Sequence, residues 1–567
     1  MSDSQKECTV SEYILARLQQ LGVECVFGVP GDFFLPFLDY IEDHPTIKWV
    51  GCTNELNAAY ASDGLICRIC AVLQIVGVPS TILQSKGLKL HHTLGDGRYD
   101  AFREAYSNFV VAKAHLEPPR TEGGISNAGK EIDRAIFEAL KNKRPTYLTL
   151  PSDLIHTKIP SNPLQRPITN ESIRKILAMP QNKAQLEEVS KKICSLFAAS
   201  KRPCILVDLD VTRFNIQKEI EDLISKTNMT FFSTLLGKAV IDENLPQFGG
   251  VYAGIITVPP VKKAFEDADF ILCIGCLKSD VNTASFSGII PPERTVELHS
   301  DRTIIQHATY LGDGHLSLLP KLIPDLAKVA SSKQSGEHAV RTIHGGLADV
   351  TEAQPDKEGE VILHDEFWPL WATFFEKNDL YLSEFGCSSF GLVDIKMPSG
   401  SDSLTQMLWG SIGWATGATL GAAMAAREQG RRCLLFAGDG SIVLSIQDIS
   451  TIIRQDLKPI IVILNNDGYS CERVIHGEKR VYNDIGNWQW QKLLEVFGPV
   501  PRSYASHKIS TRQELEGLLT GPLLRDRSKL HLVECVLEKM DAPRHLRHFA
   551  SLVKIANQGP DSRKKLL

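Results

Sequence analysis

Two motifs in the C-terminal third have the chemistry of a cation site. GDGS at 438–441 follows one apolar segment, and NNDG at 465–468 follows the next. The carboxylate of Asp439, the amide of Asn466 and a nearby backbone carbonyl are hard oxygen ligands, which suit Mg²⁺ or Ca²⁺ and not zinc. Either motif alone is also typical of a turn that ends a strand. Together they indicate a site for a cation and a phosphate.

The segments around these motifs predict the element that positions them. Residues 433–437 and 459–464 are apolar enough for buried strands, and isoleucines at helical spacing lie between them, at 446, 449, 452 and 453. A strand, helix and strand in this order form a right-handed parallel unit, so both motifs should emerge at the carboxyl edge of one sheet. We expect GDGS to be a turn whose glycines let backbone N–H groups approach an anion, with a helix starting after it.

Similar alternation of apolar strands and helices fills the rest of the chain and predicts an α/β protein with three parallel-sheet domains in tandem. We expect linkers at 160–167 and 331–360. The predicted domains are 1–160, 183–330 and 361–545, followed by a tail at 546–567.

The composition excludes several classes of protein. The 567 residues carry a formal charge of −5, which gives no basic field for nucleic acid or an anionic membrane. Apolar runs are too short to span a bilayer, and the first residues do not form a secretory signal, so we expect a cytoplasmic protein. Thirteen scattered cysteines fit buried, reduced thiols better than disulfides or the zinc site that Cys67/Cys70 and Cys273/Cys276 would suggest.

The paired motifs resemble the signature of thiamine-diphosphate enzymes, and the whole chain resembles the fungal pyruvate decarboxylases among the 2-oxo acid decarboxylases. The similar segments are GVPGDF at 28–33, NELNAAYASDG at 54–64, KGLKLHHTLGDG at 86–97, LGKAVIDENLPQFGGVYAG at 236–254, WGSIGWATGATLGAA at 409–423, NNDGYSCERVIHG at 465–477 and YNDIGNW at 482–488. An adjacent His pair and a Glu after GYSC distinguish this family from other thiamine-diphosphate enzymes.

The resemblance implies thiamine diphosphate and Mg²⁺ as cofactors, with a pyrimidine-binding first domain and a diphosphate-binding third domain. Asp439, Asn466 and the carbonyl of Gly468 would hold the metal. Other residues that would contact the cofactor are Glu55, Cys387, Gly410, Ile412, Gly440 and Ser441.

Catalytic roles also follow from the resemblance. Glu55 would hydrogen-bond the aminopyrimidine ring and favour the tautomer that deprotonates the thiazolium carbon. Its position alone favours an ordinary first-turn glutamate, and the surrounding NELNAAYASDG reverses that preference. Asp32, His91, His92 and Glu472 would form the proton-handling set. Ile412 would prop the cofactor in its bent form.

The chain departs from the family between 65 and 76, where one strand and its crossover helix are missing from the first domain. This departure leaves two explanations open, a gene-model error and a true loss. Cys387 stands where relatives carry a hydroxyl residue. Cys471 is smaller than the usual β-branched residue on the substrate side and predicts a roomier pocket.

We therefore expect a decarboxylase of 2-oxo acids, most simply of pyruvate to acetaldehyde and CO₂. Indolepyruvate or phenylpyruvate is an alternative substrate, and a catalytically impaired paralogue is an alternative function. No flavin-site signal supports a carboligating synthase. The family builds its active sites between subunits, so the resemblance also implies a homodimer or homotetramer.

Overall fold

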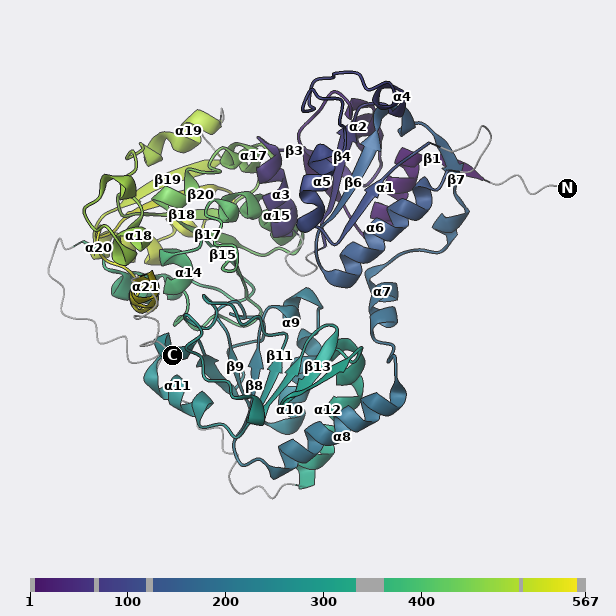
Figure 1. Ribbon diagram of the computed structural model, residues 1–567. Helices are drawn as coiled ribbons and strands as arrows, with labels where there is room; N and C mark the ends of the chain where they lie inside the picture. The colour runs from purple at the N-terminus through teal and green to yellow at the C-terminus, as the bar shows by residue number, and fades with distance from the viewer. Residues whose placement is uncertain (1–5, 66–70, 119–125, 333–360, 499–502, 558–567) are drawn as a thin grey trace. The chain divides into compact units, whose positions relative to one another are not determined.

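The computed structural model describes residues 6–65, 71–118, 126–332, 361–498 and 503–557, which fall into two units, Met1–Met179 and Pro180–Leu567 (Figure 1). Most of the predicted second linker lies outside the described residues, as do Cys67 and Cys70. No helix in the described ranges is long and apolar enough to cross a membrane.

Among its described residues, the first unit contains two separate parallel sheets and a short antiparallel pair. Its strands are β1 (Glu7–Thr9), β2 (Cys25–Gly28), β3 (Lys48–Gly51), β4 (Leu73–Val78), β5 (Ala112–His115), β6 (Thr146–Pro151) and β7 (Lys158–Pro160). Its helices are α1 (Val10–Gln20), α2 (Leu35–Glu42), α3 (Glu55–Leu65), α4 (Thr81–Ser85), α5 (Ala101–Ala105), α6 (Ala128–Asn142) and α7 (Asn170–Leu177). Thr9 and Glu12 form a capping box at the start of α1, where each side chain binds the other residue's backbone N–H.

Strand pairing in this unit bears on the segment predicted to be missing. Among the described residues, β2 pairs with β3, whereas β4, β6 and β5 form a second sheet in that order. The connection from α3 to β4 runs through residues 66–70, which lie outside the described ranges. The loss of a strand there stays a prediction.

The second unit begins with a seven-stranded sheet of order β10-β9-β8-β11-β12-β13-β14. Its strands are β8 (Pro203–Val207), β9 (Thr230–Ser233), β10 (Phe248–Val251), β11 (Phe270–Ile274), β12 (Thr295–Leu298), β13 (Arg302–Ile305) and β14 (Ala308–Leu311). Its helices are α8 (Lys183–Ala199), α9 (Asp210–Arg213), α10 (Gln217–Thr227), α11 (Pro259–Glu266) and α12 (His315–Ser332). The predicted strands pair in parallel, but β13 and β14 add an antiparallel edge that the sequence analysis did not predict.

The sheet that positions the cation motifs is six-stranded and entirely parallel, with the order β16-β15-β17-β18-β20-β19. Its strands are β15 (Leu380–Ser383), β16 (Asp402–Thr405), β17 (Cys433–Gly438), β18 (Ile460–Asn465), β19 (Tyr504–Ile509) and β20 (Leu530–Val536). The helices are α13 (His364–Ala372), α14 (Cys387–Gly391), α15 (Trp414–Glu428), α16 (Asp439–Ile442), α17 (Asp448–Arg454), α18 (Ser470–Ile475), α19 (Leu493–Phe497), α20 (Arg512–Thr520) and α21 (Arg544–Asn557).

Two sequence predictions in this region need correction. GDGS is not a turn, because Asp439 begins the short helix α16. The following helix, α17, starts only at Asp448, so Ile446 precedes it. The predicted tail at 546–567 includes most of α21, which buries Leu546, Phe549 and Leu552 in the core.

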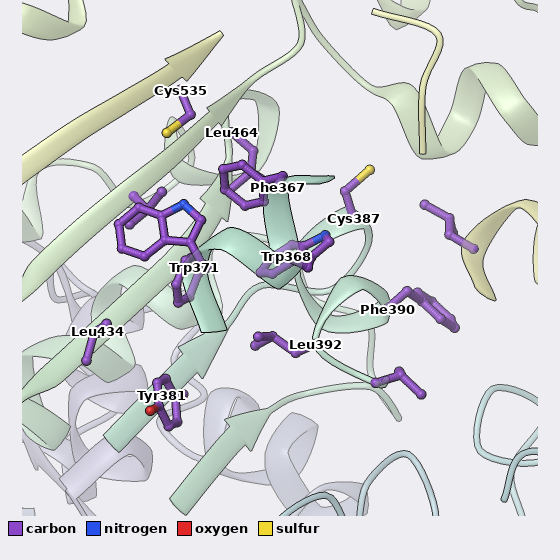
Figure 2. Close-up of a cluster of buried hydrophobic side chains, with 14 of the residues drawn as sticks. Phe367, Trp368, Trp371, Tyr381, Cys387, Phe390, Leu392, Leu434, Leu464 and Cys535 are labelled. Atoms are coloured by element: carbon purple, nitrogen blue, oxygen red, sulfur yellow. The ribbon is translucent and has the colours of Figure 1, made fainter. Parts of the chain in front are cut away.

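The central strands of this sheet are apolar and buried up to their carboxyl ends, as expected for parallel strands. Trp368 and Trp371 of α13 are buried in a cluster that includes Leu434 of β17 and Leu464 of β18 (Figure 2). Cys387, at the start of α14, belongs to the same cluster. This packing fixes the strand ends from which the site residues emerge.

Candidate active site

The two cation motifs meet at the carboxyl edge of the six-stranded sheet, as their spacing predicts. β17 and β18 are adjacent and parallel, with Gly438 in register with Leu464. Asp439 and Asn466 follow these strand ends directly and are 2% and 4% exposed. A buried carboxylate beside a buried amide requires compensating partners, which is a first sign of a ligand site.

Three oxygen ligands can converge between these residues. The Asn466 amide lies 3.2 Å from Asp439 Oδ1 and 2.9 Å from the carbonyl oxygen of Gly468, measured from the same amide atom. With nitrogen at that position, Asn466 donates to both oxygens, and its own oxygen accepts from Ser470 Oγ. With the amide oxygen of Asn466 at that position instead, three oxygens surround one point: those of Asn466, Asp439 and the Gly468 carbonyl. Neighbouring ligands of an octahedral Mg²⁺ are about 3 Å apart, so the donor set and its spacing fit this ion.

The loop around this point is held by the Asp439 carboxylate. Asp439 Oδ1 accepts from the N–H of Gly440 at 2.8 Å, and Oδ2 accepts from the N–H of Gly468 at 2.9 Å. Burial outweighs these hydrogen bonds and raises the pKa of Asp439 to about 6. Gly468 has φ +120° and an added Cβ would lie 2.3 Å from the carbonyl oxygen of Asn483, so this position requires glycine.

Gly440 and Ser441, the predicted diphosphate contacts, form the first turn of α16 and are buried. A Cβ at Gly440 would lie 2.6 Å from the Tyr469 ring, so glycine permits this close approach. Their contact with a diphosphate stays a prediction.

Gly410 and Ile412, two of the predicted cofactor contacts, lie in the segment that connects β16 to α15. Gly410 has φ +57°, and Gln406 Oε1 accepts from its N–H at 3.1 Å. Ile412 is half-buried.

Glu384, which sequence reasoning missed, anchors this segment. It lies just after β15, is 1% exposed, and its Oε2 accepts from the N–H groups of Gly413 at 3.1 Å and Ala415 at 3.2 Å. The carboxylate therefore fixes the backbone immediately after Ile412. An acidic residue close after the apolar segment 380–382 is the signal that could have revealed it.

Replacing Glu384 by glutamine should change how stability depends on pH. Burial raises the pKa of Glu384 from 4.5 to about 7, so its favourable contribution is fully present below about pH 4.5 and is lost as the pH rises to about 7. The loss of stability amounts to about 3 kcal/mol. Glutamine stays neutral and does not lose this contribution. The stability of Glu384→Gln relative to the wild type should therefore increase as the pH is raised from about 5 to about 8. Urea midpoints at both pH values measure the gain, and a constant difference contradicts it.

Glu472 and Cys387 complete the predicted residues of the second unit. Glu472 is exposed in the first turn of α18, and the following residue, Arg473, is buried and donates to the carbonyl oxygen of Asp467 and to Asp484 Oδ1, each at 2.7 Å. The arginine holds α18 against the NNDG loop. Cys387 is buried, 8% exposed, at the start of α14.

In the first unit, the structure brings together three members of the predicted proton-handling set. Nε2 of His91 lies 2.6 Å from Asp32 Oδ2, and Nε2 of His92 lies 3.9 Å from Asp32 Oδ1. Phe33 stacks on His91 with ring centroids 5.1 Å apart. The hydrogen bond from His91 lowers the pKa of Asp32. All three polar side chains are exposed and can exchange protons with a ligand.

Glu55 is the first residue of α3 and is exposed. The helix start is capped by its neighbour, because Asn54 Oδ1 accepts from the N–H of Asn57 at 2.8 Å. The carboxyl of Glu55 is therefore not needed as the cap of this helix.

Comparison with known proteins gives three matches to domains described for thiamine pyrophosphate enzymes. The N-terminal TPP binding domain matches residues 8–82, the central domain 190–313 and the C-terminal TPP binding domain 384–527. The chain is 38% identical to pyruvate decarboxylase of Kluyveromyces lactis over 580 aligned residues, which cover 97% of this chain and 99% of the relative. It is also 38% identical to pyruvate decarboxylase isozyme 1 of Saccharomyces cerevisiae over 581 residues, with the same coverage.

Proposed function

Since this chain belongs to the pyruvate decarboxylase family of thiamine pyrophosphate enzymes, we propose that it converts pyruvate to acetaldehyde and CO₂ with the help of Mg²⁺. Thiamine-diphosphate-dependent decarboxylation of a 2-oxo acid follows from the family. Pyruvate as the substrate and Mg²⁺ as the metal are our proposals. The convergence of Asp439, Asn466 and the Gly468 carbonyl at one sheet edge supports Mg²⁺. The similarity to pyruvate decarboxylases supports pyruvate.

In this proposal Asp439, Asn466 and the carbonyl of Gly468 would hold Mg²⁺, and backbone N–H groups at the start of α16 would bind the diphosphate of the cofactor. When bound, thiamine diphosphate accepts the electron pair that is left when the bond to CO₂ breaks, a task for which side chains offer no group. Gly410 and Ile412 position the cofactor rings, and Glu384 keeps that segment in place through Gly413 and Ala415.

The remaining residues move protons. Glu55 exchanges a proton with the aminopyrimidine ring. Asp32, His91, His92 and Glu472 supply the proton that replaces CO₂ on the substrate carbon and take up the proton lost when the aldehyde leaves. The hydrogen bond between His91 and Asp32 supports this role, because it links a proton donor to a carboxylate that stays charged.

The family resemblance also supports a homodimer or homotetramer in the cytoplasm, with active sites between subunits. Leu408 and Trp409, next to Gly410, are 49% and 73% exposed. Large apolar side chains that are exposed beside a site favour an apolar partner surface, and a second copy of the chain is the partner that we propose.

Two further candidates rest on single features. The smaller Cys471 side chain favours activity on branched or aromatic 2-oxo acids beside pyruvate. An impaired paralogue is favoured only by the short connection between α3 and β4, whereas the site residues described above are all retained.

A direct assay separates these functions. The purified chain with Mg²⁺ and thiamine diphosphate should release CO₂ and acetaldehyde from pyruvate, and a coupled alcohol dehydrogenase assay should follow the aldehyde. Phenylpyruvate tests the wider pocket, and a chelator should stop turnover until Mg²⁺ is restored. Cofactor binding without turnover of either acid would support the paralogue and refute the decarboxylase.

A further inference from the structure

Two cysteine side chains from different helices lie together near the proposed cofactor site. Cys387 starts α14 and Cys471 lies in the first turn of α18, and the neighbouring Cys471 thiol together with burial raises the pKa of the Cys387 thiol. The Cys471 sulfur also lies against the backbone of Gly386, since a Cβ there would be 2.8 Å from it. Gly386 has φ +115°, so a residue without a side chain makes room for this contact.

The two thiols differ in access to solvent. Cys387 is buried in the apolar cluster, with its sulfur directed away from the Trp368 ring (Figure 2). Cys471 is only half-buried, so a reagent can reach it. A second pair of neighbouring thiols, Cys273 and Cys276, is buried at both positions and provides an internal comparison. Reactivity of thiols depends on such access as well as on their ionisation.

We propose that Cys387 and Cys471 form a redox modification site, which a small-molecule disulfide converts to an intramolecular disulfide bond. The Cys471 thiolate attacks one sulfur of the external disulfide and releases one thiol. The Cys387 thiolate then attacks Cys471 Sγ in the mixed disulfide and displaces the second thiol. The two cysteines lose two electrons and two protons, and the external disulfide gains them as two free thiols.

The bond should affect the site next to it. A disulfide holds the two sulfurs about 2.05 Å apart, so it ties the first turn of α18 to the start of α14. Glu472 follows Cys471 directly, and Cys387 is itself a predicted cofactor contact. We therefore expect oxidation to switch off turnover reversibly. This effect rests on the proposed function, whereas the bond itself does not.

Mass spectrometry of the full-length holoenzyme tests the bond without using activity. The protein is incubated with oxidised glutathione, its free thiols are alkylated, and the digest is mapped. We expect a linked peptide pair containing Cys387 and Cys471, two hydrogens lighter than the separate peptides, while Cys273 and Cys276 are alkylated only after unfolding. Mapping also separates this bond from any formed by Cys67 and Cys70.

The outcomes against the proposal are distinct. Free thiols at both positions, or glutathione on Cys471 beside a free Cys387, would overturn the intramolecular bond. If the bond forms, turnover of pyruvate should fall at least about tenfold and return with dithiothreitol, since Glu472 acts in proton transfer. Treatment with oxidant should not lower the activity of Cys387→Ser or Cys471→Ser below the activity that the same variant has before treatment. Undiminished turnover of the linked protein would refute the switch, and an enzyme inactive before oxidation would refute the proposed function instead.

Discussion

Replacing Asp439 by alanine should weaken Mg²⁺-dependent binding of thiamine diphosphate by at least about 100-fold. Outer-shell partners alone typically contribute 10–100-fold to metal affinity, and Asp439 supplies a direct, charged ligand in our proposal. The substitution also removes the acceptor for the N–H groups of Gly440 and Gly468, so the loop that presents the Gly468 carbonyl loosens. Titration of the apoprotein with cofactor at several Mg²⁺ concentrations, followed by tryptophan fluorescence, measures the effect.

Asp467→Asn is the matched control for this substitution. Asp467 adjoins Asn466, but its Oδ2 accepts from Lys539 at 2.6 Å and its side chain is half exposed. Asparagine tolerates the positive φ of 59° at this position. Its cofactor affinity should stay within a few-fold of the wild type, as expected for a surface ion pair. An unchanged dissociation constant for Asp439→Ala would remove Asp439 from the metal site.

The pH dependence of wild-type affinity provides a second test of the same ligand. Because burial raises the pKa of Asp439 to about 6, the carboxyl is deprotonated above this pH and gains a proton below it. Proton and metal compete for the same oxygens, so Mg²⁺ affinity should fall as the pH is lowered through about 6. Asp439→Ala should lack this pH dependence.

The sequence predicts the metal site well because the site follows from strand order. Two apolar segments joined by a helix form a parallel pair, and each ends in a polar motif, so both motifs lie at one edge. The local conformation was less predictable. Asp439 begins α16 instead of a turn. Its carboxylate accepts two backbone hydrogen bonds there, and these outweigh the turn preference of Asp-Gly. Neither bond is visible from local residue types.

Features that depend on distant contacts were missed. Glu384 looks like an ordinary polar residue after a strand until the fold brings it to the backbone of Gly413 and Ala415. The antiparallel strands β13 and β14 are short and lie at a sheet edge, where the apolar pattern is weak. The grouping of Asp32 with His91 came from family resemblance, because no periodicity relates residues so far apart.

Glu55→Gln should lower kcat for pyruvate by at least about 100-fold while leaving affinity for thiamine diphosphate within about tenfold. Glutamine keeps the size of the side chain but cannot exchange a proton at this position, and general acid–base groups contribute about 10²–10⁴-fold to rate. Since Asn54 already caps α3, the substitution should not unfold the helix. Steady-state rates with saturating cofactor, together with circular dichroism of the variant, measure both effects.

Glu12→Gln is the matched control for Glu55→Gln. It distinguishes proton exchange by Glu55 from the effect of replacing any glutamate at a helix start. Glu12 also lies in a first helical turn of the same unit, where its Oε2 accepts from the N–H of Thr9 at 2.6 Å. Glutamine retains an acceptor for that bond, so the control should change stability by no more than about 1 kcal/mol and should keep the wild-type kcat. If both variants turn over pyruvate at the wild-type rate, Glu55 is a helix-start residue and proton exchange with the aminopyrimidine ring must come from another group.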